Sequence, residues 1–361
     1  MHALPLVRSL IRQGEVDLLG MIESLRTVKL LGNEYHRLNA LQYVRAICAM
    51  GVVLFHAEGG VNAYWKHENQ ISWFSWGHLG VPMFFCLSGF VISYSGYLRP
   101  RKSADFLFSR IARIYPAYLI VALLFITCML VLPAGSFSSA PSLTIDQVVR
   151  TVFFDFGRTG GYVYVGWTLF YEMMFYLCFS LFSFRFAEIA KRCQFYYFIA
   201  SCLLLCYFFS LHRIADFLFG VSAFLIAGNP NADSYSKPPV VVLGIVALAG
   251  LFVNPVGALC AIFVISILLA EKHKPNLFGS KSLLVLGDSS YSIYLVQVLT
   301  VSASLKISKL LTTIFPFQIE RYYVFYLLAI CVSCIATIVA GILMRKHIEK
   351  PLFFHLMSIK K

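Results

Sequence analysis

Two residues that could do chemistry lie in one long apolar segment, Arg45 and His56, with ten residues between them. On an α-helix this spacing is about 16 Å along the axis. Eleven steps of about 100° bring both side chains to nearly the same face. That face would carry a cation near one end and an imidazole, a potential general base, further along. The same spacing also fits an arginine that snorkels to a membrane surface and a histidine satisfied by a hydrogen bond in the core.

A carboxylate, Glu172, lies in the aromatic segment Gly-Trp-Thr-Leu-Phe-Tyr-Glu that begins at Gly166. If this segment is a membrane helix that enters near Val163, Glu172 lies about 13 Å deep, close to the depth expected for His56. A buried carboxylate beside an imidazole fixes its tautomer and stabilises the imidazolium. We therefore expect Glu172 to lie beside His56.

A basic stretch at 99–113 contains Arg110 and Arg113, which share one face of a helix that enters an apolar segment at Pro116. Two guanidinium groups side by side suit the binding of a pyrophosphate or polyphosphate group. Anchoring on the cytosolic side of a membrane, or binding of lipid head groups, explains these residues equally well.

Other ionisable residues in apolar segments are weaker candidates. Glu58 can reach water on the outer side, and Asp216 follows Arg213 at a spacing that favours an internal ion pair. Asp288 lies near the start of an apolar segment with one polar face. That face carries Tyr291, Tyr294 and Gln297.

The composition argues against a soluble protein. Hydrophobic residues make up 59% of the 361 residues, charged residues only 13%, and the mean hydropathy is +0.75. Soluble domains are close to half apolar and a quarter charged.

The ten cysteines lie mostly in apolar runs, so we expect small buried side chains and no disulfide framework. The Cys331/Cys334 pair has no second such pair and no histidine partner, so we expect no metal site.

Apolar runs predict an all-α, polytopic membrane bundle of about ten transmembrane helices. Asn254-Pro255 predicts a tight turn between the seventh and eighth spans. In the second span, the small residues Gly80, Ser88 and Gly89 permit close helix approach. The predicted spans are 42–58, 79–97, 114–133, 163–183, 195–211, 213–228, 239–253, 255–271, 283–305 and 322–344.

Basic residues set the predicted orientation. With both termini cytosolic, 22 basic residues lie on the cytosolic side and seven on the outer side. The net charge of +13 therefore reflects topology, and no nucleic-acid partner is expected. Residues 1–37 are predicted to be a cytosolic N-terminal extension, and 38–361 the transmembrane domain. An interfacial helix, a disordered tail and a misassigned start codon explain this extension equally well.

Six segments carry motifs in chain order: Arg45-x10-His56, Gly-Val-x-x-Phe-Phe-x-Leu-Ser-Gly-Phe at 80–90, Arg110-x-x-Arg113-Ile-x-Pro116, Trp-Thr-Leu-x-x-Glu at 167–172, Ser-Tyr-Ser-Ile-Tyr-Leu at 290–295 and Glu349-Lys-Pro351. Together these motifs resemble the acyltransferase-3 family of integral-membrane O-acyltransferases. Residues 41–46 and 166–173 are most similar to the branch that acetylates bacterial exopolysaccharides. Gln297 stands where many relatives have histidine, and Pro82 replaces a usual acidic residue.

This resemblance implies transfer of an acyl group, usually acetyl from cytosolic acetyl-CoA, to a hydroxyl of a cell-envelope or exported polysaccharide at the bacterial inner membrane. His56 would be the general base or carry the acyl group, and Glu172 would orient it. No metal and no permanently bound cofactor is implied, since acyl-CoA is a co-substrate. The partners would be a polysaccharide or lipid-linked glycan, membrane lipids and polysaccharide-synthesis proteins. Arg45, Arg110 and Arg113 would bind acyl-CoA, and Ser88, Trp167 and Tyr291 would line the substrate site.

Two other classes of function compete with an enzyme. In a proton-coupled transporter or flippase of a glycan intermediate, His56 and Glu172 would relay protons. In a scaffold for polysaccharide synthesis, the same residues would be vestigial. The Arg110/Arg113 pair favours the enzyme, because a proton-coupled carrier has no need of a phosphate site.

Overall fold

The computed structural model describes residues 38–65, 72–98, 101–131, 144–157, 162–180, 213–224, 254–314 and 322–359. Within these ranges the chain is helical and contains no strand, which confirms the predicted all-α class. The predicted spans 195–211 and 239–253, and the N-terminal extension 1–37, lie outside the described residues.

Four helical segments of the described ranges are long and apolar enough to cross a membrane. They match the first, second, third and last predicted spans. The last one was predicted at 322–344, and the helix runs over the same residues. The four segments belong to α3 (Asn39–Trp65), to η1 (Ser75–Leu79) with α4 (Gly80–Leu98), to α5 (Ser103–Val131), and to α15 (Tyr322–Met344) with its continuation.

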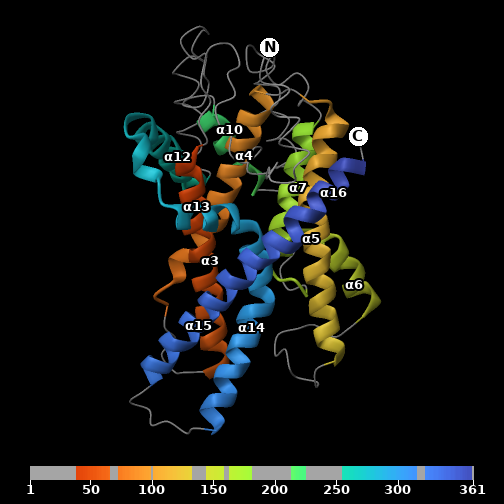
Figure 1. Cartoon of the computed structure of the whole chain (residues 1–361), viewed down its shortest axis with the longest axis vertical. Helices are drawn as coiled ribbons and strands as arrows, with labels where there is room; N and C mark the ends of the chain where they lie inside the picture. The colour runs from red at the N-terminus through yellow and green to blue at the C-terminus, as the bar shows by residue number, and fades with distance from the viewer. Residues whose placement is uncertain are drawn as a thin grey trace, which may run out of the picture.

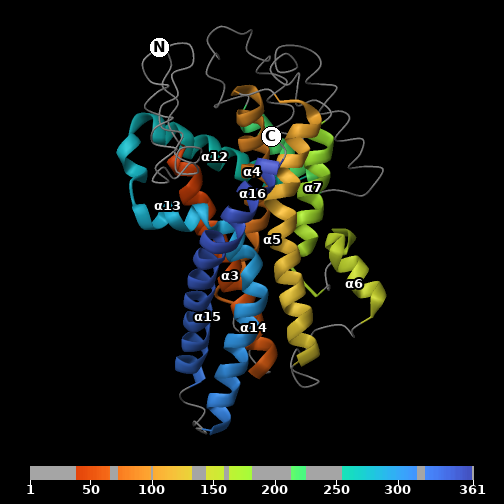
Figure 2. The same ribbon diagram turned by 45° about the vertical axis from the view of Figure 1, so that its right-hand side comes forward.

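The predicted ninth span, 283–305, is not one straight helix. Two helices, α13 (Lys281–Asp288) and α14 (Ser290–Ile314), meet at an angle of 70°. Figures 1 and 2 show α13 lying across the bundle while α14 runs along it. A side chain at Gly287 would overlap the backbone of Gln42, so the turn is packed directly against the start of α3. Hydropathy reports how apolar a segment is and carries no signal for such a bend.

Helix α3 is the central element of the described part of the chain. It contacts η1, α4, α12, α13, α14 and α15, and Figure 1 shows α14 and α15 alongside its second half. A row of alternating alanine and valine residues on α3 packs against these helices. The row consists of Ala49, Val53, Ala57 and Val61, all buried, and it packs with Ile293, Val301 and Leu305 of α14 and Tyr326, Ala329 and Ile330 of α15.

Helices α4 and α10 (Ile214–Ala223) pack backbone to backbone. A β-carbon on Gly89 would overlap the carbonyl oxygen of Phe217, and one on Gly220 would overlap that of Cys86. Gly80 similarly lies against the Cys48 carbonyl of α3. The prediction that small residues in the second span permit close packing is therefore confirmed for Gly80 and Gly89.

Helix α12 (Pro255–His273) begins where the sequence predicted a turn. The side chain of Asn254 caps it by accepting a hydrogen bond from the Gly257 amide at 3.0 Å. Pro255 occupies the first helical position, where its missing N–H costs nothing. The short helix η4 (Pro275–Phe278) then leads to α13.

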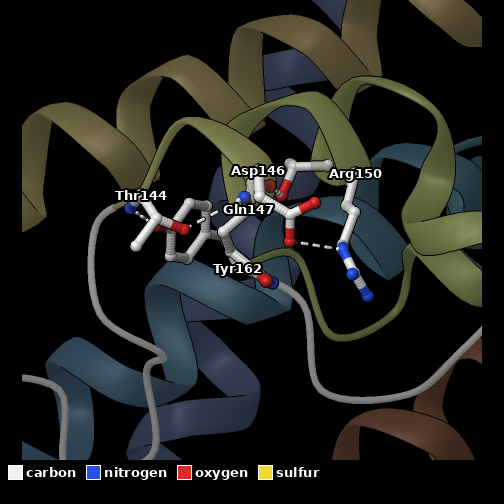
Figure 3. Close-up of polar contacts among 6 residues, drawn as sticks. Thr144, Asp146, Gln147, Arg150 and Tyr162 are labelled. Atoms are coloured by element: carbon white, nitrogen blue, oxygen red, sulfur yellow. Dashed lines mark hydrogen bonds and ion pairs between the residues drawn. The ribbon is translucent and has the colours of Figure 1, made fainter.

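A peripheral helix, α6 (Ile145–Val152), precedes the fourth predicted span. Figure 3 shows its first turns: Thr144 accepts a hydrogen bond from the Gln147 amide at 3.2 Å, and Arg150 pairs with Asp146 at 2.7 Å. The Thr144 amide donates to the Tyr162 hydroxyl at 3.3 Å. This contact ties the start of α6 to the segment that leads into the next helix.

The short helix η2 (Phe154–Gly157) follows α6 and precedes α7 (Gly166–Ser180) in the chain. Tyr162, Val163 and Val165 are already buried ahead of the helix. At the other end of the chain, α15 continues through a π-helical segment, η6 (Arg345–Glu349), into α16 (Lys350–Ile359). In both figures α16 lies beside α5.

Candidate active site

A cavity of about 880 Å³, part of it open to solvent, lies between α3, α4, α5, α7 and α14. Apolar side chains of α4 form much of its wall. Polar parts of the wall come from five of the eight predicted site residues and from one residue that was not predicted, Tyr176. They are Arg45, Ser88, Arg110, Arg113, Glu172 and the hydroxyl of Tyr176. A sixth predicted residue, Tyr291, also lines it.

Arg45 enters the cavity from α3 and is held at the start of α14. Its Nε donates a hydrogen bond to the Ser290 hydroxyl at 3.1 Å. Acidic groups are bound to other partners near this point. Asp288 pairs with Arg345 at 3.7 Å, and Glu349 accepts a hydrogen bond from Ser292. The 70° turn between α13 and α14 thus places Ser290 where it can orient Arg45.

Arg110 and Arg113 lie on one face of α5, which continues through Pro116 as a single helix. The Arg110 guanidinium lies over the rings of Phe106 and Tyr176, with its carbon 5.3 and 5.8 Å from the two ring centroids. Its Nε is buried and has no hydrogen-bond partner within the described ranges. A buried, unsatisfied N–H of a cation is a group that an anionic ligand would satisfy.

Glu172 shares this wall with the arginines. Its carboxylate accepts hydrogen bonds from the Ser88 hydroxyl at 3.2 Å and from the Tyr176 hydroxyl one turn along α7. The expectation that Glu172 lies beside His56 is wrong. The chain is buried before α7 begins, so Tyr164 takes the place beside His56. Glu172 lies six residues into α7, about 9 Å along the helix from its start at Gly166.

His56 lies outside the cavity wall and has a partner of its own. Its Nδ1 lies 3.3 Å from the amide oxygen of Gln297 on α14. Its ring lies edge-on to Tyr164, with 4.9 Å between the centroids. Gln297 is held in turn because its Nε2 donates to the Tyr294 carbonyl at 2.9 Å.

Tyr294 connects the two places. It lines the cavity, where its hydroxyl lies 2.8 Å from that of Thr168, and it precedes Gln297 by one turn of α14. The cavity-lining residue Tyr294 therefore lies about 4.5 Å along the α14 axis from the residue that contacts His56. The polar face predicted for residues 291–297 is confirmed, and it runs from the arginines to the histidine.

Several weaker candidates have structural partners. Glu58 does not reach water: it is 3% exposed and accepts hydrogen bonds from the Phe74 amide at 3.0 Å and the Tyr326 hydroxyl at 2.9 Å. Asp216 is hydrogen-bonded by the Asn254 amide at 2.7 Å, in place of the ion pair expected with Arg213. Both carboxylates fasten helix ends or loops to neighbouring helices.

Trp167 is the predicted lining residue that lies off the cavity wall; its ring packs against Tyr171 with centroids 6.1 Å apart.

Sequence reasoning missed Tyr176 and Tyr164. Tyr176 follows Glu172 by four residues, the spacing at which helical side chains meet, so the sequence held a signal for it. Tyr164 precedes the helix and had none. Within the described ranges, no three metal-ligating side chains gather into a site.

Residues 38–346 match a protein family whose common region is described as an acyltransferase domain. The matched region extends from the start of α3 into η6 and includes every helix that lines the cavity. No curated protein and no solved structure matches the chain.

Proposed function

Because the chain belongs to the acyltransferase-3 family, we propose that it transfers an acyl group, in the simplest case acetyl, from cytosolic acyl-CoA to a hydroxyl of a cell-envelope or exported polysaccharide. The family makes the chain an acyltransferase, and its long apolar helices make it a membrane protein. The donor, the acceptor and the bacterial inner membrane are the proposed parts.

The observation that carries the proposed donor is the wall of three arginines. Arg45, Arg110 and Arg113 line one cavity, and the Nε of Arg110 is buried without a partner among the described groups. CoA carries several phosphate charges, and guanidinium groups bind phosphate through paired hydrogen bonds. Hydrogen bonds to charged groups contribute about 1.5–3 kcal/mol each. The apolar remainder of the cavity suits the uncharged arm of CoA.

The proposed base is His56. It would take the proton of the acceptor hydroxyl as that oxygen attacks the thioester carbonyl, so that a carbon–oxygen bond forms and the carbon–sulfur bond breaks. The departing CoA thiolate would then receive the proton from the imidazolium. A general base in this role contributes about 10²–10⁴-fold to the rate. The arm of CoA would have to extend about 16 Å along α3, from Arg45 to His56.

Glu172 takes a different role in this proposal from the one the sequence suggested. Its hydrogen bonds hold Ser88 and Tyr176, and Tyr176 lies under the Arg110 guanidinium. Glu172 therefore positions the arginine wall and balances part of its charge. It would act on the binding of the donor, not on the proton transfer at His56.

The proposed orientation puts the arginines toward the cytosol and His56 deeper in the membrane, with both termini cytosolic. The acceptor would then approach His56 from the opposite side, and acyl transfer would carry the group across the membrane. A reporter enzyme fused after Lys361 tests the orientation. Activity of a cytosol-dependent reporter is expected, and activity of a reporter that works only in the periplasm would overturn it.

The transfer itself is tested with radiolabelled acetyl-CoA, purified protein in vesicles and crude envelope glycan. We expect label in the glycan as an alkali-labile ester, no label without glycan, and none with the His56→Ala variant. If the purified protein binds CoA but the label remains in acetyl-CoA with every glycan fraction, the proposed acceptor is contradicted. Parallel incubation with propionyl-CoA measures how far the enzyme selects the acyl group.

A further inference from the structure

The geometry points to Gln297 as the residue that fixes the tautomer of His56. We infer that the Gln297 amide oxygen accepts the hydrogen on His56 Nδ1, so that Nε2 carries no proton and is the basic nitrogen. The contact is 3.3 Å long and joins α3 to α14. Gln297 is a positioning residue in this inference, since it acts through His56. The basic role of Nε2 rests on the proposed function, whereas the tautomer does not.

The orientation of the Gln297 amide follows from its second contact. Its Nε2 donates to the Tyr294 carbonyl at 2.9 Å, and a carbonyl oxygen can only accept. The amide oxygen is therefore the atom that faces His56. Because an amide oxygen has no hydrogen to donate, His56 Nδ1 must supply it. A neutral imidazole carries one ring proton, so Nε2 is then unprotonated.

The surroundings of Gln297 leave it little freedom. Its side chain is 0% exposed, and the clamp to the Tyr294 carbonyl lies within the same helix. Rotating the amide would turn its oxygen toward the Tyr294 carbonyl oxygen, where neither group can donate, so that hydrogen bond would be lost. A buried polar group left without its partner costs about 1–3 kcal/mol. The arrangement therefore favours one orientation and, through it, one tautomer.

No carboxylate takes part in the contacts of the His56 ring within the described ranges. The ring contacts Phe55 and Tyr164, besides Gln297. Nearby titratable groups have other partners. Glu58 bonds Phe74 and Tyr326, His78 bonds the Ser75 carbonyl and approaches only Phe55, and the Tyr294 hydroxyl meets Thr168.

A neutral orienting group has a chemical consequence. A carboxylate would hold the imidazolium as an ion pair, as in hydrolase triads. An amide fixes the ring but does not add a counter-charge. The proton that His56 takes from a hydroxyl would then pass on readily to the leaving thiolate, which suits a reaction that must reset the base in every cycle.

Nitrogen-15 NMR of the full-length protein, labelled at histidine and held at neutral pH, tests the tautomer directly. Subtraction of the spectrum of His56→Asn isolates the signal of His56. We expect a protonated Nδ1 and an unprotonated Nε2 in the wild type, and a shift toward the other tautomer in Gln297→Met, which removes the acceptor at similar volume. A proton on Nε2 in the wild type would overturn the inference.

Kinetics of acyl transfer separate positioning from packing. Gln297→Met should lower kcat by about 10- to 100-fold, part of the gain a general base provides, and leave KM for acetyl-CoA within about twofold. Gln297→Glu keeps the length of the side chain and an oxygen toward Nδ1. In its neutral form it also donates to the Tyr294 carbonyl, so it should recover most of the rate and the wild-type tautomer.

Thr300→Val is the matched control on α14. It removes another, partly buried contact between helices, the 2.6 Å hydrogen bond to Thr337, and Thr300 does not contact His56. We expect it to keep both the wild-type kcat and the wild-type tautomer of His56.

A wild-type kcat and a wild-type tautomer in Gln297→Met would refute the inference. If Gln297→Met does not fold, the wild-type spectrum and Gln297→Glu decide it. If no glycan is acylated, the proposed function fails while the NMR result still decides the role of Gln297.

Discussion

The two polar regions along α3 differ in how their charged groups are partnered. Around Arg45 the wall is cationic, borders a cavity that is partly open to solvent and includes an Arg110 nitrogen that lacks a partner among the described residues. Around His56 the ring is enclosed by aromatic side chains and one neutral amide. The first arrangement suits the capture of an anion. The second suits proton transfer, which needs fixed geometry more than charge. Substitutions in the two regions should therefore affect different kinetic constants.

The largest effect is expected at His56. His56→Ala should reduce acyl transfer below detection, because general-base catalysis contributes about 10²–10⁴-fold. Binding of acyl-CoA, measured by calorimetry, should stay within about twofold of wild type, since His56 lies off the cavity wall. A variant that retains most of the wild-type rate would leave His56 as an ordinary core histidine.

The next largest effect is expected at the arginine wall. Arg110→Ala or Arg113→Ala should weaken CoA binding by about 10- to 150-fold, because each loses a charge-assisted contact of about 1.5–3 kcal/mol. Lysine at either position should restore binding only in part, since a point charge cannot form two parallel hydrogen bonds. Unchanged CoA affinity in the double alanine variant would disprove the assignment.

Glu172→Gln sharpens the comparison because sequence and structure disagree about it. The amide keeps an oxygen for Ser88 and Tyr176 and removes a negative charge from a cavity proposed to hold phosphates. We expect CoA to bind about 3- to 10-fold more tightly, equivalent to about 0.7–1.4 kcal/mol. The measurement is CoA affinity at low and high salt. A fall in kcat with unchanged affinity would instead place Glu172 with His56.

The smallest effect is expected at Arg150, which provides a control for charge alone. Arg150 pairs with Asp146 on the surface of α6 (Figure 3), and it does not line the cavity. Exposed pairs of this kind contribute about 0.3–0.5 kcal/mol. Arg150→Ala should therefore leave KM and kcat unchanged and shift thermal stability only slightly. A KM change as large as that of Arg110→Ala would mean that net charge, not the arginine wall, sets donor affinity.

The sequence was sufficient for features that hydropathy and helical spacing determine. The last span, the position of α3 and the shared face of Arg110 and Arg113 follow from apolar length and the period of the helix. The turn at Ser289 and the position of Glu172 relative to His56 do not. Both depend on tertiary packing, in one case of Gly287 against α3 and in the other of a buried segment ahead of α7.

The partner of His56 was missed for a different reason. An ionisable residue, Glu172, was the expected partner because charged groups in apolar helices are unfavourable without one. The contact is instead made by an uncharged side chain. The sequence pointed to Gln297 as part of a polar helix face and as a departure from the family pattern, but not as the partner of His56. A glutamine in an apolar helix predicts a hydrogen-bond partner just as a carboxylate does, because burying an amide is also unfavourable unless it is hydrogen-bonded.

The glycine contacts between α4 and α10 would dominate any survey of tolerance to substitution. At Gly89 and Gly220 an added methyl group would collide with a backbone carbonyl, which no rearrangement of side chains relieves. Such positions would be as intolerant as His56, although they take no part in the chemistry. Only a survey that scores the amount of protein in the membrane separately from product formed would distinguish them, since the glycine variants would fail in the first measurement and the histidine variant only in the second.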